Sequence, residues 1–121
     1  MAETESNILA ELRDLVREFV QERDWEKFHT PKNLAVSLSV EAAELLEPFQ
    51  WLKTGDGEEL TSSARIKVKH EMADVFVYLI RLADRLDVDL VSAVREKLEQ
   101  NKVKYPADRV RGDARKYDEY S

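Results

Sequence analysis

The sequence contains no cysteine, and glycine and proline each occur only three times in 121 residues. The lack of cysteine excludes a disulfide scaffold and a thiolate metal site. A collagen-like, linker-rich or many-turned all-β chain would need far more glycine and proline, so we expect long uninterrupted helices. The longest purely apolar run, residues 75–80, is much shorter than the roughly 20 residues that a membrane-spanning helix needs.

Acidic residues outnumber basic ones by 25 to 19, which gives a net charge of −6. The acidity is concentrated in the first half, and the second half is slightly basic. An acidic chain lacks the basic stripe of a duplex-DNA-binding protein, so we expect no nucleic-acid polymer as a partner. The start of the sequence lacks the basic-then-apolar order of a signal peptide, so we expect a cytoplasmic protein with no membrane partner.

The spacing of apolar residues predicts four helices. Between residues 8 and 20 they recur at the i, i+4, i+7 spacing of one helical stripe, with charged residues on the other faces. Pro31 suits the first turn of a second helix, and Asp87 or Asp89 suits the N-cap of the last. The later helices are expected over residues 32–47, 64–85 and from that cap to 104. Residues 1–121 should therefore form a single all-α domain, a four-helix bundle with its core over 8–105 and an irregular, charged tail over 106–121.

The second expected helix is apolar on nearly every face. Between residues 34 and 46 only Ser37, Ser39, Glu41 and Glu44 are polar. One packing layer within the chain covers only part of such a helix, so we expect other copies of the chain to pack against it. The sequence therefore predicts a homo-oligomer, either a dimer or a tetramer.

Two acid pairs stand on the second and third expected helices. Glu41 and Glu44 share one face of the second helix, and Glu71 and Asp74 are likewise three residues apart on the third. A carboxylate on a buried face is unfavourable unless it is paired or binds a cation, and facing acid pairs repel each other. Four carboxylates gathered between two helices would form an all-oxygen site that suits Mg²⁺, with Mn²⁺ as an alternative, and does not suit Zn²⁺.

Two other interpretations of these acids remain open. Each pair could be a solvated stripe, and on the third helix the charged face continues to Arg81 and Arg85. In that case the chain would be a non-enzymatic helical scaffold or interaction protein. A ferritin-like di-iron bundle needs Glu-x-x-His on two helices, a requirement that the chain's two histidines do not meet, so iron redox chemistry is not expected.

Glu41-Ala-Ala-Glu44 followed by Glu71-Met-Ala-Asp74 resembles the Glu-x-x-Glu…Glu-x-x-Asp signature of the all-α MazG-like nucleoside triphosphate pyrophosphohydrolases. Further stretches resemble the dCTP pyrophosphatase subgroup, namely residues 23–29 (RDWEKFH), 33–34 (NL), 49–51 (FQW) and 101–106 (NKVKYP). The resemblance covers residues 8–117. It implies hydrolysis of a (d)NTP between the α- and β-phosphates to a nucleoside monophosphate and pyrophosphate. It also implies a tetramer and Mg²⁺ held by Glu41, Glu44, Glu71 and Asp74.

The chemistry of such a substrate agrees with these residues. A triphosphate brings about four negative charges to an acidic protein, so a divalent cation must bridge phosphate and carboxylate. We expect Glu44 to accept the proton of the attacking water, with Glu41 beside it in the catalytic set.

Aromatic residues are the candidates for the base end of the substrate. The candidates to stack on a nucleobase or form a hydrogen bond with it are Trp25, Phe28, His29, Trp51 and Tyr78. The resemblance favours His29, Trp25 and Trp51 for a pyrimidine pocket. The tryptophans could instead be core or interface anchors, and His29 a turn residue before Pro31.

Donors on the fourth expected helix are the candidates for the phosphate end. Lys97, Asn101 and Lys104 recur at i, i+4 and i+7, and the resemblance assigns this pattern to triphosphate contact. Arg111 and Lys116 in the tail could add to it, and the stripe could also be an ordinary solvated basic face. Asn33 could contact the triphosphate or satisfy backbone groups at the helix start.

The leading hypothesis is therefore a Mg²⁺-dependent pyrophosphohydrolase acting on dCTP or 5-modified dCTP, with a role in nucleotide-pool sanitation. A broad-specificity NTP pyrophosphohydrolase is the alternative within the same reaction. The scaffold is the alternative outside it.

Overall fold

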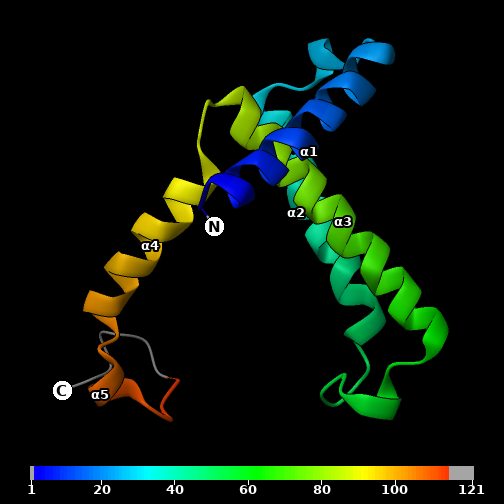
Figure 1. Cartoon of the computed structure of the whole chain (residues 1–121). Coiled ribbons are helices and arrows are strands. Elements are labelled where there is room, and N and C mark those ends of the chain that lie inside the picture. Colours follow the sequence, from blue (N-terminus) through cyan, green and yellow to red (C-terminus); the bar gives the residue numbers. More distant parts are fainter. Residues whose placement is uncertain (1, 115–121) are drawn as a thin grey trace. The chain divides into compact units, whose positions relative to one another are not determined.

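The computed structural model describes residues 2–114 (Figure 1). Side chains are described from residue 8 onward. These residues form five α-helices and three short 3₁₀ helices and contain no β-strand. The all-α prediction is confirmed. The chain divides into two compact units between Val88 and Asp89, and each unit is described by itself.

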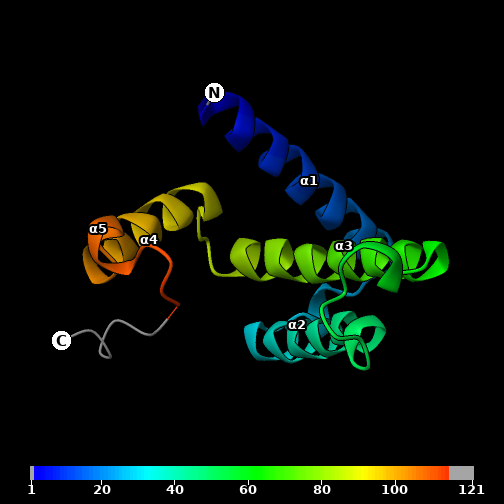
Figure 2. The same cartoon turned by 90° about the horizontal axis from the view of Figure 1, so that it is seen from below.

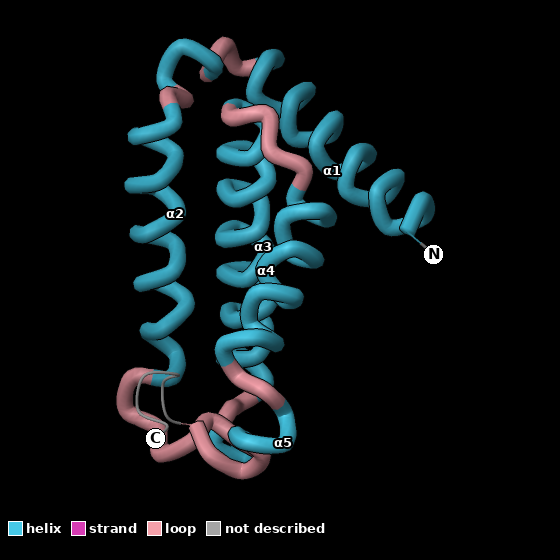
Figure 3. The backbone as a smooth tube through the Cα atoms, turned by 90° about the vertical axis from the view of Figure 1, so that its left-hand side faces the viewer, coloured by secondary structure: helices cyan, strands magenta, loops and turns pink. Residues whose placement is uncertain are grey.

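The first unit is built around one long helix, α3. Helix α1 spans Ala2–Glu22, α2 spans Pro31–Leu46 and α3 spans Ser62–Arg85. Helix α3 lies alongside α2 for much of its length and also contacts α1 (Figures 2 and 3). All three helices contribute to the most buried apolar side chains, which are Val20, Leu34, Ile80 and Ala83. The core therefore lies where the end of α1 and the start of α2 meet the second half of α3.

Side-chain caps fix where α2 and α3 begin. The Thr30 hydroxyl accepts a hydrogen bond from the Asn33 backbone N–H at 3.2 Å, and Pro31 occupies the first turn of α2. The Thr61 hydroxyl does the same for the Ala64 N–H of α3, also at 3.2 Å. These caps define the first turns of the two helices.

The connection between α2 and α3 is organised by one carboxylate. It includes the 3₁₀ helices η2 (Glu47–Phe49) and η3 (Gly57–Glu59). The Glu59 side chain accepts hydrogen bonds from the backbone N–H groups of Lys53, Thr54 and Gly55, which lie between these two short helices, at 2.9 to 3.2 Å. These bonds lower the pKa of Glu59. Gly55 has φ +81°, and a β-carbon at this position would approach the Phe49 ring to 2.8 Å, so the turn requires glycine.

The second unit contains α4 (Leu90–Lys104) and the single-turn helix α5 (Ala107–Val110). Asp89 caps α4 by accepting a hydrogen bond from the Ser92 N–H at 3.2 Å. In neither unit does any described helix combine the length and the apolar character that a membrane span requires.

The predicted helices are found with small shifts at their ends. Helix α2 begins at Pro31, one residue before its predicted start, and α3 begins at Ser62 instead of residue 64. Asp89, one of the two residues predicted as the N-cap of α4, is that N-cap. The first helix is longer than predicted, and the prediction of an irregular tail is wrong at α5, which follows Pro106. The part of that tail over residues 115–121 lies outside the described residues. A single four-helix domain stays a prediction.

Candidate metal and nucleotide site

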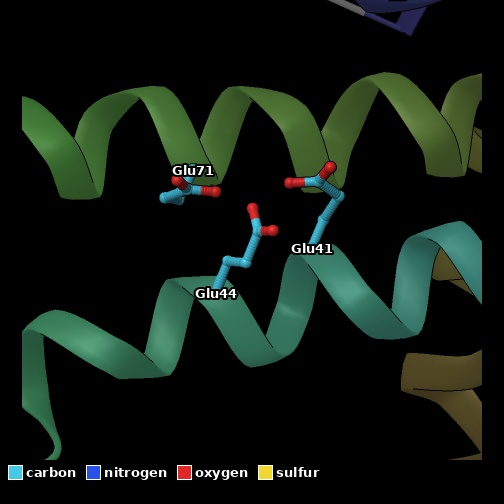
Figure 4. A group of neighbouring side chains, drawn as sticks. All are labelled: Glu41, Glu44 and Glu71. Carbon is cyan, nitrogen blue, oxygen red and sulfur yellow. The ribbon is translucent and has the colours of Figure 1, made fainter.

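Three of the four predicted acids converge between α2 and α3. Glu41 and Glu44 stand one turn apart on α2, and Glu71 faces them from α3 (Figure 4). Each contributes a carboxylate oxygen to a group whose members all lie within 4.8 Å of one another. The Glu44 side chain lies between those of Glu41 and Glu71 (Figure 4). We call these three residues the acid cluster.

The acid cluster is electrostatically unfavourable without a cation. The Oε2 atoms of Glu41 and Glu71 are buried and have no hydrogen-bond partner. Burial raises the pKa of Glu41 to about 7, helped by a hydrogen bond to Glu44 and by the charges of Glu44, Asp74 and Glu71. Burial and the charge of Glu44 also raise the pKa of Glu71. These groups therefore hold protons more tightly than free carboxylates do, which is expected where a cation is needed to balance them.

Asp74 is the acid that the structure does not bring into this group. Its side chain is exposed and supplies none of the oxygens within 4.8 Å. Its charge nevertheless acts on both Glu41 and Glu71, so it lies beside the acid cluster. Lys67, one turn before Glu71 on α3, pairs with Glu47 at 3.5 Å. The participation of Asp74 in a four-carboxylate metal site stays a prediction.

The aromatic candidates for the base end differ in their placement. The rings of Trp25 and His29 lie side by side, with centroids 6.5 Å apart and a tilt of 56°. Trp51 is 87% exposed and Trp25 is 42% exposed, so neither tryptophan is a core anchor of this chain. Tyr78 is half-buried on α3, one turn beyond Asp74. The Nδ1 atom of His29 accepts a hydrogen bond from the Nε of Arg81 at 3.3 Å.

The predicted phosphate contacts fall in both units. The Asn33 side-chain amide donates a hydrogen bond to the Phe28 carbonyl at 3.0 Å. Asn33 thus satisfies a backbone group at the start of α2, which was one of its two expected roles. Lys97, Asn101 and Lys104 lie on α4 in the second unit, and Arg111 follows α5. Lys116 lies outside the described residues. Contact of these side chains with a triphosphate stays a prediction.

A charged network near the end of α3 was missed by sequence reasoning. Asp84 accepts a hydrogen bond from the Nε of Arg17 on α1 at 2.7 Å and one from the Nη1 of Arg81 at 3.3 Å. Arg81 is buried, so the interpretation of the whole α3 stripe as solvated surface is wrong at this residue. The only signal in the sequence was an arginine and an aspartate three residues apart on an apolar helix. The partner Arg17, 67 residues from Asp84, could not be read from spacing.

Comparison with known proteins agrees with the acid motif. Residues 36–120 match the sequence model of the MazG-like family. The chain belongs to the MazG-like family. A solved relative, described as a pyrophosphatase from Archaeoglobus fulgidus DSM 4304, is 48% identical in sequence with a TM-score of 0.74, and the match covers 80% of this chain and 91% of that one.

Mammalian relatives of this MazG-like chain are longer proteins. Human dCTP pyrophosphatase 1 is 42% identical over 113 residues, which are 92% of this chain and 66% of the human protein. Mouse dCTP pyrophosphatase 1 is 43% identical over 111 residues, which are 90% of this chain and 65% of the mouse protein. The chain thus spans slightly less than two thirds of the length of these relatives. The resemblance to the dCTP pyrophosphatase subgroup is confirmed.

The raised pKa of Glu41 predicts a pH-dependent stability in metal-free solution. A carboxyl group whose pKa rises from 4.5 to about 7 on folding makes the folded state lose stability as pH increases through that interval. Glu41→Gln removes this titration. The free energy of unfolding of the variant, relative to that of the wild type, should therefore increase as the pH rises from 5 to 8. The gain should be on the order of 1 kcal/mol, because solvent screens a half-buried group.

Urea unfolding in the presence of a chelator measures this difference. Glu18→Gln, which removes an exposed carboxylate of α1, is the matched control and should leave the pH dependence unchanged. A stability difference between Glu41→Gln and the wild type that stays constant with pH would contradict the electrostatic description of the cluster.

Proposed function

We propose that this chain is a divalent-cation-dependent nucleoside triphosphate pyrophosphohydrolase. It hydrolyses a (d)NTP, with dCTP or 5-modified dCTP preferred, between the α- and β-phosphates. The products are the nucleoside monophosphate and pyrophosphate. The convergence of Glu41, Glu44 and Glu71 carries this proposal, and the names of the pyrophosphatase relatives support it. Such an enzyme would remove these nucleotides from the cytoplasmic pool.

The acid cluster fits a hard divalent cation. Its donors are all carboxylate oxygens, the ligands that Mg²⁺ and Mn²⁺ prefer, and it includes no imidazole or thiolate. Two of its oxygens are buried without a hydrogen-bond partner, and coordination to a cation would satisfy them. Glu41, Glu44, Glu71 and Asp74 would hold Mg²⁺. When bound, Mg²⁺ supplies the positive charge that lets phosphate oxygens approach these acids and lowers the pKa of a coordinated water.

Side chains of this chain are proposed to accept the proton of the attacking water and to bind the phosphates. Glu44, between its two neighbours, accepts a proton from the water that attacks the phosphorus atom, and Glu41 supports it in the catalytic set. A new P–O bond forms to the water oxygen as the α–β bridging P–O bond breaks, and pyrophosphate leaves with the electron pair of that bond. Asn33, Lys97, Asn101 and Lys104 are the proposed phosphate ligands, since each offers N–H donors to phosphate oxygens.

The base end of the proposed site is aromatic. Trp25 and His29 form a neighbouring pair of rings, and Trp51 presents an almost fully exposed indole. An exposed indole is costly to leave in water and provides a stacking face for a nucleobase. Tyr78 lies on α3 between the acids and the His29 end, so it completes the proposed base set.

We also propose that the chain acts as a homo-oligomer, with a tetramer favoured over a dimer. Val36, Val40 and Leu46 on α2 are each more than half exposed, so the part of the chain that the structure describes leaves an apolar face of this helix uncovered. A second copy of the chain would bury it, and the proposed sites would then stand near subunit contacts.

Light scattering coupled to size-exclusion chromatography tests the assembly. The expected mass is four times the 14.1 kDa of one chain, and Val40→Glu should lower it by placing a charge on the apolar face. Lys32→Glu, an exposed polar position on the same helix, is the control and should keep the wild-type mass. A monomeric wild type at tens of micromolar would contradict the proposed assembly.

The reaction is tested by incubating the protein with each dNTP and Mg²⁺ and identifying the products. We expect monophosphate and pyrophosphate, no turnover with a chelator, and partial or full activity with Mn²⁺. Glu44→Gln should lower kcat by about 10²- to 10⁴-fold with the helices intact, as expected for loss of a general base. Glu18→Gln is the control. Release of orthophosphate and a nucleoside diphosphate would refute the proposed bond cleavage, and no turnover of any nucleotide would favour the scaffold.

The base set is tested by the selectivity of two truncations. Trp51→Ala and His29→Ala should each lower kcat/KM for dCTP by roughly tenfold or more, since base–aromatic contacts contribute about 1–3 kcal/mol. Their effect on the other dNTPs should be smaller, so the preference for dCTP should fall. Unchanged preference among the four dNTPs in both variants would remove these residues from the base pocket and favour the broad-specificity enzyme.

A further inference from the structure

A buried arginine holds the ring of His29 from one side. The Arg81 side chain is 6% exposed, and its Nε donates to the Nδ1 of His29. Arg85 acts on the same residue from the next turn of α3, because its Nε donates to the His29 backbone carbonyl at 2.9 Å. Both the ring and the backbone of His29 are therefore fixed by α3.

Arg81 is itself fixed by a carboxylate that two helices share. Asp84, with a side chain 9% exposed, accepts hydrogen bonds from Arg81 and from Arg17 of α1. The hydrogen bond from Arg17 and the charges of Arg17 and Arg81 lower the pKa of the Asp84 carboxyl, so it stays ionised and keeps the Arg81 guanidinium in place. Burying such a charged group is costly, and apolar residues of similar volume often pack at least as well. A role for Arg81 in positioning His29 would explain why this buried charged network is present.

The direction of the hydrogen bond determines the protonation of His29. A guanidinium has donors only and does not lose its proton in proteins. The Nδ1 of His29 must therefore act as the acceptor, which leaves the single ring proton on Nε2. Burial and the charges of Arg81 and Arg85 lower the pKa of His29, so the neutral ring persists at neutral pH.

We infer that Arg81 is a positioning residue that holds His29 as the neutral Nε2–H tautomer, so that the ring presents one hydrogen-bond donor to the substrate base. This inference rests on the proposed function, which puts His29 at the base end. The inferred tautomer specifies the chemistry of the preferred base. The base atom that binds His29 accepts a hydrogen bond, as a ring carbonyl oxygen or an unprotonated ring nitrogen does.

The arrangement along α3 fits a nucleotide with two chemically different ends. Arg81 follows Glu71 by ten residues, about 15 Å along the helix, and Tyr78 lies between them on the same stripe. An open hollow of about 460 Å³ lies beside the arginine, lined by Glu26, Lys27, Arg81, Asp84 and Arg85. The hollow borders Arg81 and Arg85, the two arginines that hold His29, and none of the three clustered acids lines it.

Nitrogen-15 NMR of the histidine side chains tests the tautomer without any nucleotide. The chain has two histidines, and the exposed His70 is an internal reference in every spectrum. At pH 7 the two-bond couplings of His29 should show the proton on Nε2. In Arg81→Met this pattern should give way to a mixture of tautomers, while Arg65→Met, which removes an exposed arginine of the same helix, should leave it unchanged.

Kinetics on the same variants test the consequence. Arg81→Met should lower kcat/KM for dCTP by about three- to tenfold, the value of one ordinary hydrogen bond, and hydrolysis of the triphosphate should persist. Arg81→Lys, which keeps a cationic donor, should recover part of this loss. Circular dichroism shows whether each variant is folded, and the wild-type spectrum alone decides the tautomer if Arg81→Met does not fold.

Two results would overturn the inference. One is a wild-type His29 with its proton on Nδ1 or on both nitrogens. The other is an Arg81→Met protein with the wild-type tautomer or with the wild-type kcat/KM for dCTP. Failure of the proposed function is recognised separately, since the wild type would then hydrolyse no nucleotide although the NMR spectra would still report the state of His29.

Discussion

Mutual repulsion among the carboxylates of Glu41, Glu44 and Glu71 is the constraint on which the rest of this structure depends. Three acids from two helices lie within 4.8 Å of one another, and two of their oxygens have no hydrogen-bond partner. Such a group lowers the stability of the folded chain at neutral pH unless a cation neutralises it. The α2–α3 pair must hold the acids together by other means, and buried apolar residues such as Leu34 and Ile80 provide them.

Two parts of α3 have opposite electrostatic surroundings. At Glu71 the helix faces acids, whereas around Asp84 the arginines outnumber the carboxylate that they bind. Neighbouring helices contribute to both groups: α2, which Thr30 caps, carries two of the acids, and α1 carries Arg17, which binds Asp84. A nucleotide also has two different ends, a charged phosphate tail and an uncharged base. The division along one helix is the physical basis of the proposed site.

The sequence predicted those features that depend on local spacing. Helix positions followed from apolar periodicity and from capping residues such as Asp89, and the acid pairs were identified because i, i+3 spacing puts side chains on one helical face. Features that depend on contacts between distant residues were not predicted. Three such features follow from how the helices pack: the exposure of Asp74, the pairing of Arg17 with Asp84 and the hydrogen bond from Arg81 to His29. The tryptophans were ambiguous because an aromatic residue suits a core and a binding surface equally well, and only their exposure decides between the two.

Binding of Mn²⁺ to the acid cluster is the most direct test of the account. Electron paramagnetic resonance can count bound Mn²⁺ in the presence of a dCTP analogue whose α–β bridge resists hydrolysis, for the wild type and for Glu44→Gln. The account predicts protein-bound Mn²⁺ in the wild type, a large loss of binding in Glu44→Gln, and wild-type binding in Glu18→Gln. Equal Mn²⁺ binding by the wild type and Glu44→Gln, or none by the wild type, would contradict the central claim that these acids are held together to bind a cation.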